Sequence, residues 1–96
     1  MLTFNDKKNL LISQLDDYAF NMTYDYIEKK QNFNMLERIG KSCLFLGTVM
    51  KKVELLTDRS EFVSLEKYVN RLIKNDKFFN RELDKFIDKN DFSRWF

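Results

Sequence analysis

The sequence predicts an all-α protein, a compact bundle of about four amphipathic helices followed by a short aromatic C-terminal tail. Proline is absent and glycine occurs only twice, so the residues that most often interrupt helices are scarce. Apolar residues recur at spacings of three and four along most of the chain. With 96 residues, of which 44% are hydrophobic and 33% charged, the chain has the size and composition of one folded domain. We therefore expect a single helical domain over residues 1–96.

The first helix is predicted over residues 4–30. Thr3 followed three residues later by Asp6 resembles a capping box, in which each residue accepts a hydrogen bond from the backbone of the other. One face of this helix is apolar. Its residues are Leu11, Leu15, Tyr18, Met22 and Tyr26. A face of this kind predicts packing against the other helices.

The second helix is predicted over residues 35–56, with Asn34 and Glu37 as its start signal. Its expected buried stripe consists of Met35, Ile39, Cys43, Leu46, Met50 and Val53. A neighbouring line of small residues is formed by Gly40, Cys43 and Gly47. Small side chains allow two backbones to come close together, so we expect close helix packing here, either within the chain or across a dimer.

The third and fourth helices are predicted over residues 60–74 and 77–89. Asp58 or Ser60 is expected to cap the third helix, and Asp76 the fourth. Asn75 is expected to end the third helix because asparagine tolerates the left-handed conformation that is common there. The expected core residues of these two helices are Phe62, Leu65, Val69, Leu72, Phe79, Leu83 and Phe86.

The residues required for common catalytic sites are missing. The chain has no histidine, which is the most frequent general base and metal ligand, and no glycine-rich phosphate loop. Acidic pairs such as Asp84 and Asp88 alternate with lysines, which is typical of a solvated helix face rather than a metal site. We therefore expect no enzyme, no cofactor and no metal site, and we interpret Cys43 as a buried structural thiol.

The sequence also contains evidence on where in the cell the protein lies. The amino terminus lacks a basic region followed by an apolar segment, and no apolar run reaches the roughly 18 residues that a membrane helix needs. A single cysteine cannot form an internal disulfide, so nothing indicates an oxidising compartment. We expect a cytoplasmic protein without a membrane span. One alanine, no proline and many Lys, Asn and Phe residues are typical of an AT-rich genome, such as that of a Gram-positive bacterium or its phage.

Two surfaces are candidates for binding. The tail supplies Phe92, Arg94, Trp95 and Phe96 as candidate partner-binding residues, because aromatic side chains are enriched at interface hot spots. The tail could instead fold back over the open end of the bundle. A candidate basic ridge follows the last two helices and consists of Lys67, Arg71, Lys74, Lys77, Arg81, Lys85 and Lys89. It suits phosphates or an acidic protein, although the acidic residues between these bases also fit a simple solvated face.

Several aromatic residues fall off or beside the predicted stripes, and they leave either extra core or an apolar interface. They are Phe20, Tyr24, Phe33, Phe45, Phe78 and Phe92. The small size, the helical bundle and the bulky C-terminus resemble those of bacteriocin immunity proteins of Gram-positive bacteria, and equally those of small phage-encoded inhibitors.

The leading hypothesis is a non-enzymatic protein-interaction module that binds a larger protein and inhibits or regulates it. The specific form we favour is a phage or mobile-element regulator that blocks a host defence or transcription protein. The alternatives are a nucleic-acid-binding protein that uses the basic ridge, and an immunity protein. A homodimer is left open by the sequence.

Overall fold

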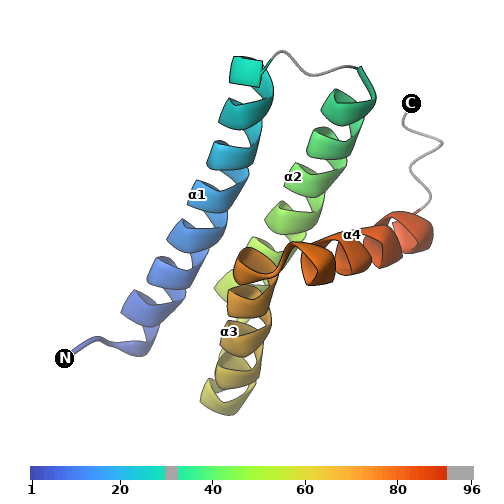
Figure 1. The fold of residues 1–96 in the computed structure, drawn as a ribbon. Coiled ribbons are helices and arrows are strands. Elements are labelled where there is room, and N and C mark those ends of the chain that lie inside the picture. Colours follow the sequence, from blue (N-terminus) through green and yellow to red (C-terminus); the bar gives the residue numbers. More distant parts are fainter. Residues whose placement is uncertain (30–32, 91–96) are drawn as a thin grey trace.

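The structure, a computed structural model, describes residues 1–29 and 33–90. Within these ranges the chain forms four α-helices and no strand (Figure 1). They are α1 (Phe4–Lys29), α2 (Phe33–Leu55), α3 (Arg59–Lys74) and α4 (Asp76–Asn90). The all-α bundle predicted from the sequence is confirmed. The predicted aromatic tail lies outside the described residues.

The helices form two layers. Figure 1 shows α1 and α2 running antiparallel and side by side, as a hairpin. α3 packs on α1 and α4 packs on α2, so that both lie on the same side of the hairpin. The buried core between the layers consists of Leu11, Leu15, Phe45, Leu46, Val49, Val53, Phe62, Val69, Leu72, Phe78, Phe79 and Leu83. The predicted apolar residues of α1, α3 and α4 lie in this core or pack against it, except Tyr26 of α1.

Short-range capping interactions define where two of the helices begin. At the start of α1, the Thr3 backbone N–H donates to Asp6 Oδ2 at 3.0 Å, and the Asp6 N–H donates to Thr3 Oγ1 at 3.1 Å. The predicted capping box is therefore confirmed. At the start of α3, Asp58 Oδ1 accepts from the Ser60 N–H at 2.7 Å, so Asp58 is the cap and Ser60 donates to it.

The junction between α3 and α4 differs from the prediction. Asn75 ends α3 in an extended conformation, with φ −133° and ψ 103°, and not in the left-handed one. Its side-chain Oδ1 accepts a hydrogen bond from the Phe78 N–H at 3.0 Å. Asn75 is thus the residue that caps α4, and the predicted cap, Asp76, is the first residue of the helix. Because a single residue joins the two helices, the chain turns sharply and α4 crosses α2 (Figure 1).

The buried face of α2 also differs from the predicted stripe. The buried residues of α2 are Ile39, Ser42, Phe45, Leu46, Val49 and Val53. Three members of the predicted stripe are only half-buried or exposed, namely Met35, Cys43 and Met50. The face is rotated because α4 packs on one flank of α2 and buries Phe45 there. Ser42 tolerates burial because its hydroxyl donates to the Arg38 carbonyl at 2.8 Å.

Candidate functional site

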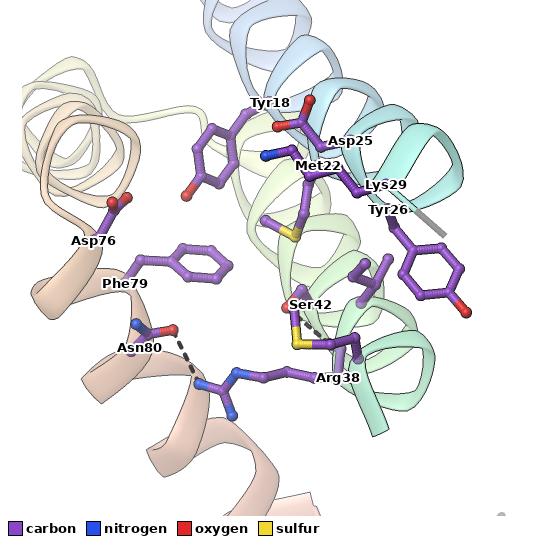
Figure 2. Close-up of a pocket in the computed structure, with 12 residues that line it drawn as sticks. Tyr18, Met22, Asp25, Tyr26, Lys29, Arg38, Ser42, Asp76, Phe79 and Asn80 are labelled. Atoms are coloured by element: carbon purple, nitrogen blue, oxygen red, sulfur yellow. Dashed lines mark hydrogen bonds between the residues drawn. The ribbon is translucent and has the colours of Figure 1, made fainter. Parts of the chain in front are cut away.

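A cavity of about 390 Å³ lies where α1, α2 and α4 meet (Figure 2). Its apolar lining includes Tyr18 and Met22 from α1, Ile39 from α2 and Phe79 from α4. The rings of Tyr18 and Phe79 meet edge to face with centroids 5.4 Å apart, which holds α1 and α4 at a defined distance. Met22 lies between the two helices in Figure 2. The cavity therefore has a preformed apolar floor.

Charged side chains of both signs surround this floor. They are Asp25 and Lys29 of α1, Arg38 of α2 and Asp76 of α4. The Arg38 guanidinium spans the gap to α4, because Nη2 donates to Asn80 Oδ1 at 3.0 Å and Nη1 lies 3.4 Å from an Asp84 carboxylate oxygen. Arg38 is thus held at one wall of the cavity, as Figure 2 shows.

Tyr18 contributes a hydroxyl to the cavity wall. Partial burial raises the pKa of Tyr18, and the negative charge of Asp76 raises it further. The phenol is consequently protonated near neutral pH and can both donate and accept a hydrogen bond. An apolar floor with a few polar groups at its edge is typical of a pocket that holds a small ligand, and a partner's side chain can fill such a pocket in the same way.

The sequence did not bring these residues together. Tyr18, Met22 and Tyr26 were assigned to a core face, and they are only half-buried. These residues are only half-buried because α1 is long, with 26 residues, and α4 turns away from it after Asn75. The last turns of the apolar face of α1 are left only partly covered. The sequence signal for this site was the continuation of the apolar face of α1 to Met22 and Tyr26, near the end of the helix.

The seven residues of the basic ridge are all exposed. Two of them contact the same ring, since the guanidinium carbons of Arg71 and Arg81 lie 4.0 and 5.3 Å from the Phe78 centroid. Lys85 is paired with Glu82, with Nζ 3.2 Å from the carboxylate oxygen. Arg71 of the ridge therefore joins α3 to α4 by a cation–π contact, whereas the contacts of Arg81 and Lys85 lie within α4.

The line of small residues does not pack as expected within the chain. No described atom of another helix lies within 4 Å of the position that a Cβ would take at Gly40 or Gly47. Cys43 is half-buried rather than buried, and its sulfur lies 3.8 Å from Thr23 Oγ1 on α1. The close helix approach at the two glycines is therefore not made inside the described chain, because α1 contacts α2 along the Cys43 flank instead. Packing across a dimer stays a prediction.

The remaining candidates can be placed briefly. Phe92, Arg94, Trp95 and Phe96 of the predicted tail lie outside the described residues. Within residues 1–29 and 33–90, no set of three or more Cys, Asp or Glu side chains is arranged to hold a metal ion. None of the helices in the same ranges combines the length and the apolar character needed to cross a bilayer.

Comparison of the chain with protein-family models, with curated proteins and with solved structures gave no match.

Proposed function

We propose that this chain is a small non-enzymatic protein-interaction module that binds a larger protein and inhibits or regulates it. The observation that carries the proposal is the cavity between α1, α2 and α4, which joins an apolar floor to a rim of both charges. Such a cavity suits an aromatic or branched aliphatic side chain of a partner, with Arg38 and Asp76 close enough to meet polar groups beside that side chain. The proposed setting is the cytoplasm, with the chain serving as a phage or mobile-element regulator.

The test is affinity capture from nuclease-treated lysate of a Gram-positive host, followed by binding and activity assays with the purified partner. Arg38→Glu reverses the charge at the cavity rim, and Lys67→Glu makes the same charge change at an exposed site outside the cavity. We expect the partner to bind the unaltered chain and Lys67→Glu equally, and Arg38→Glu at least about tenfold more weakly, which corresponds to about 1.4 kcal/mol. Saturating amounts of the unaltered chain should also change the activity of the partner.

The proposal fails if a captured partner binds the Arg38→Glu variant as tightly as the unaltered chain. It also fails if only nucleic acid is recovered before nuclease treatment and nothing afterwards. A truncated chain that ends at Asn90 tests the predicted tail, because loss of binding on truncation alone would move the partner site from the cavity to residues 91–96.

Nucleic-acid binding by the basic ridge is the second candidate, supported by the exposure of all seven of its bases. It predicts affinity for a labelled duplex that falls steeply with salt and is reduced by Lys67→Glu. Arg38→Glu should leave that affinity unchanged. Arg38→Glu therefore weakens only the proposed protein interaction, and Lys67→Glu weakens only nucleic-acid binding. The immunity-protein alternative predicts instead that expression of the chain protects sensitive cells from a cognate bacteriocin.

A further inference from the structure

The α1–α2 hairpin carries an exposed apolar surface outside the core, which we call the outer face. At about 100° per residue, Phe20 and Tyr24 lie on the side of α1 opposite the buried Leu15, and Leu44 lies on the side of α2 opposite the buried Leu46, so this surface faces away from the core. Its members and their exposed fractions are Phe20 (66%), Tyr24 (54%), Ile27 (64%), Leu36 (46%) and Leu44 (51%). The rings of Phe20 and Tyr24 are stacked with centroids 6.3 Å apart, so they present a continuous aromatic surface. Among the described residues, nothing covers this face.

The apolar area of the outer face is similar to that of the apolar centre of a protein–protein interface. Two aromatic and three aliphatic side chains at these exposures present roughly 500 Å² of surface, as large as the largest apolar patch of a typical monomer. A standard protein interface buries about 800 Å² on each partner, of which the apolar centre is only a part. The outer face together with the polar residues around it therefore has the area of one side of a stable interface.

The two helices of the outer face carry opposite charge. Between residues 9 and 28, α1 contains no basic residue, and its acids outside the cavity are Asp16, Asp17 and Glu28. On α2, Arg38 lies at the cavity wall and Lys41 is paired with Glu37. The remaining charges of α2 are Lys51, Lys52 and Glu54, with Lys51 Nζ 3.6 Å from Glu54 Oε2, so this helix is the more basic of the two. A second copy of the chain offers the same two surfaces. The acidic α1 of one copy therefore matches the more basic α2 of another.

The register of the hairpin decides which charges would meet. Thr23 and Cys43 are in contact, and the helices are antiparallel, so Asp17 stands level with Val49 and close to Lys51. A twofold axis parallel to the hairpin would place each α1 against the partner's α2 at the same level. Asp16 and Asp17 would then face the partner's Lys51. A twofold axis parallel to the plane of the hairpin but perpendicular to its helices would instead bring the two acidic α1 helices together, which like charges oppose.

We propose that the chain forms a twofold dimer through the outer face, with α1 packed against the partner's α2. The open space above Gly40 and Gly47 allows the partner's aromatic rings to approach the α2 backbone closely. The dimer is independent of the proposed cavity function, because no residue of the outer face lines the cavity. Each copy in the dimer keeps its cavity.

The experiment is sedimentation velocity of the full chain over about a hundredfold range of concentration. Leu44 and Leu10 have the same exposure, 51%, but Leu10 lies in a different groove, between α1 and α3. We expect a concentration-dependent dimer for the unaltered chain and for Leu10→Glu, and a dissociation constant raised at least about tenfold by Leu44→Glu. Circular dichroism of each variant confirms that it is folded.

Charge reversal provides a second measurement that does not depend on the apolar substitutions. Asp17→Lys and Lys51→Asp should each weaken the dimer, and the double variant should recover most of the affinity because the facing charges are opposite again. The inference is overturned by a chain that is monomeric at every concentration, by equal dissociation of Leu10→Glu and Leu44→Glu, or by a double variant weaker than both single ones. Arg38→Glu should leave the dimer intact, so failure of the dimer and failure of the cavity function are distinguishable.

Discussion

Removal of one hydroxyl group, by Tyr68→Phe, tests the contact that joins α3 to α4. Tyr68 Oη donates to Glu82 Oε1 at 2.9 Å, and Lys85 Nζ lies 3.2 Å from Glu82 Oε2. The ring of Tyr68 packs edge to face on Phe78 with centroids 5.7 Å apart, and phenylalanine keeps that packing. The substitution therefore removes the hydrogen bond with little change in shape. Because this contact helps to orient α4, it also helps to position the cavity wall that Phe79 and Asn80 provide.

The size of the effect follows from the partner's charge. A hydrogen bond to a charged group contributes about 1.5–3 kcal/mol, and partial exposure to water places this one near the lower limit. We expect Tyr68→Phe to lower the free energy of unfolding by about 1–2 kcal/mol. For a domain of this size, each kcal/mol lowers the melting temperature by roughly 4–8 °C. Urea unfolding followed by circular dichroism measures it. Tyr24→Phe, which removes the hydroxyl of an exposed tyrosine, should change stability little.

The pH dependence of this loss of stability tests the Tyr68–Glu82 hydrogen bond a second time. Burial by itself would raise the pKa of Glu82, but the Tyr68 hydroxyl, Lys85 and Arg81 outweigh it, and the net pKa is lowered. Burial and the nearby Glu82 raise the pKa of Tyr68, so its hydroxyl stays protonated in acid and at neutral pH. A lowered carboxyl pKa stabilises the fold above the unfolded-state pKa, and this stabilisation is lost as pH falls through the folded pKa. The destabilisation by Tyr68→Phe should therefore stay constant from neutral pH down to about pH 4.3, the usual pKa of a glutamate, and shrink as pH falls further. Equal stability of the two proteins at neutral pH, or a difference that grows in acid, would refute this account of the junction.

Three further substitutions have definite expected outcomes in dilute protein. Leu46→Ala, at a fully buried position of α2, should cost about 2–5 kcal/mol, whereas Leu44→Ala on the exposed side of the same helix should cost under about 1 kcal/mol; equal costs in urea unfolding would contradict the observed burial of Leu46 and exposure of Leu44. Gly40→Ala should stabilise the chain by about 0.5–1 kcal/mol, because alanine favours the helix and no described neighbour obstructs its Cβ; a lower melting temperature would indicate a close contact there. Asp58→Ala should lower the melting temperature at neutral pH and less in acid. Hydrogen bonds from the Ser60 side chain and from the Ser60 and Glu61 backbone lower the pKa of Asp58, so its stabilisation disappears as pH falls through that value; a constant difference across the pH range would contradict it.

Helix positions and two of the helix starts could be predicted because they depend on neighbours in sequence. The expected ranges 4–30 and 60–74 agree with α1 (Phe4–Lys29) and α3 (Arg59–Lys74) to within one residue at each end. The Thr3 capping box and the Asp58 cap each act over two or three residues, so their residue types alone indicated them. Of the proposed site, the sequence identified the apolar α1 residues but assigned them all to the core.

Contacts between distant residues could not be predicted in the same way. Apolar spacing showed that α2 has a buried face, but the contact of Phe45 with Phe79 and Phe86 of α4 moved that face away from Cys43. The same rotation left Gly40 and Gly47 open, although their small size had suggested a close neighbour. Asn75 has an extended backbone instead of the predicted left-handed one, and its side chain caps α4 by accepting a hydrogen bond from the Phe78 N–H.

The sequence by itself determined the all-α class, the positions of the helices and the lack of histidine-based chemistry, because helix formation depends on hydrogen bonds and side chains within about four residues. Only the tertiary structure decided which apolar residues are buried, and it left Phe20, Tyr24 and Leu44 on an uncovered face and opened a cavity beside Arg38. The physical reason is that burial depends on which helices pack together and at what angle. Those angles are decided by contacts such as Arg38 with Asn80 and Tyr68 with Glu82, which join residues far apart in the chain.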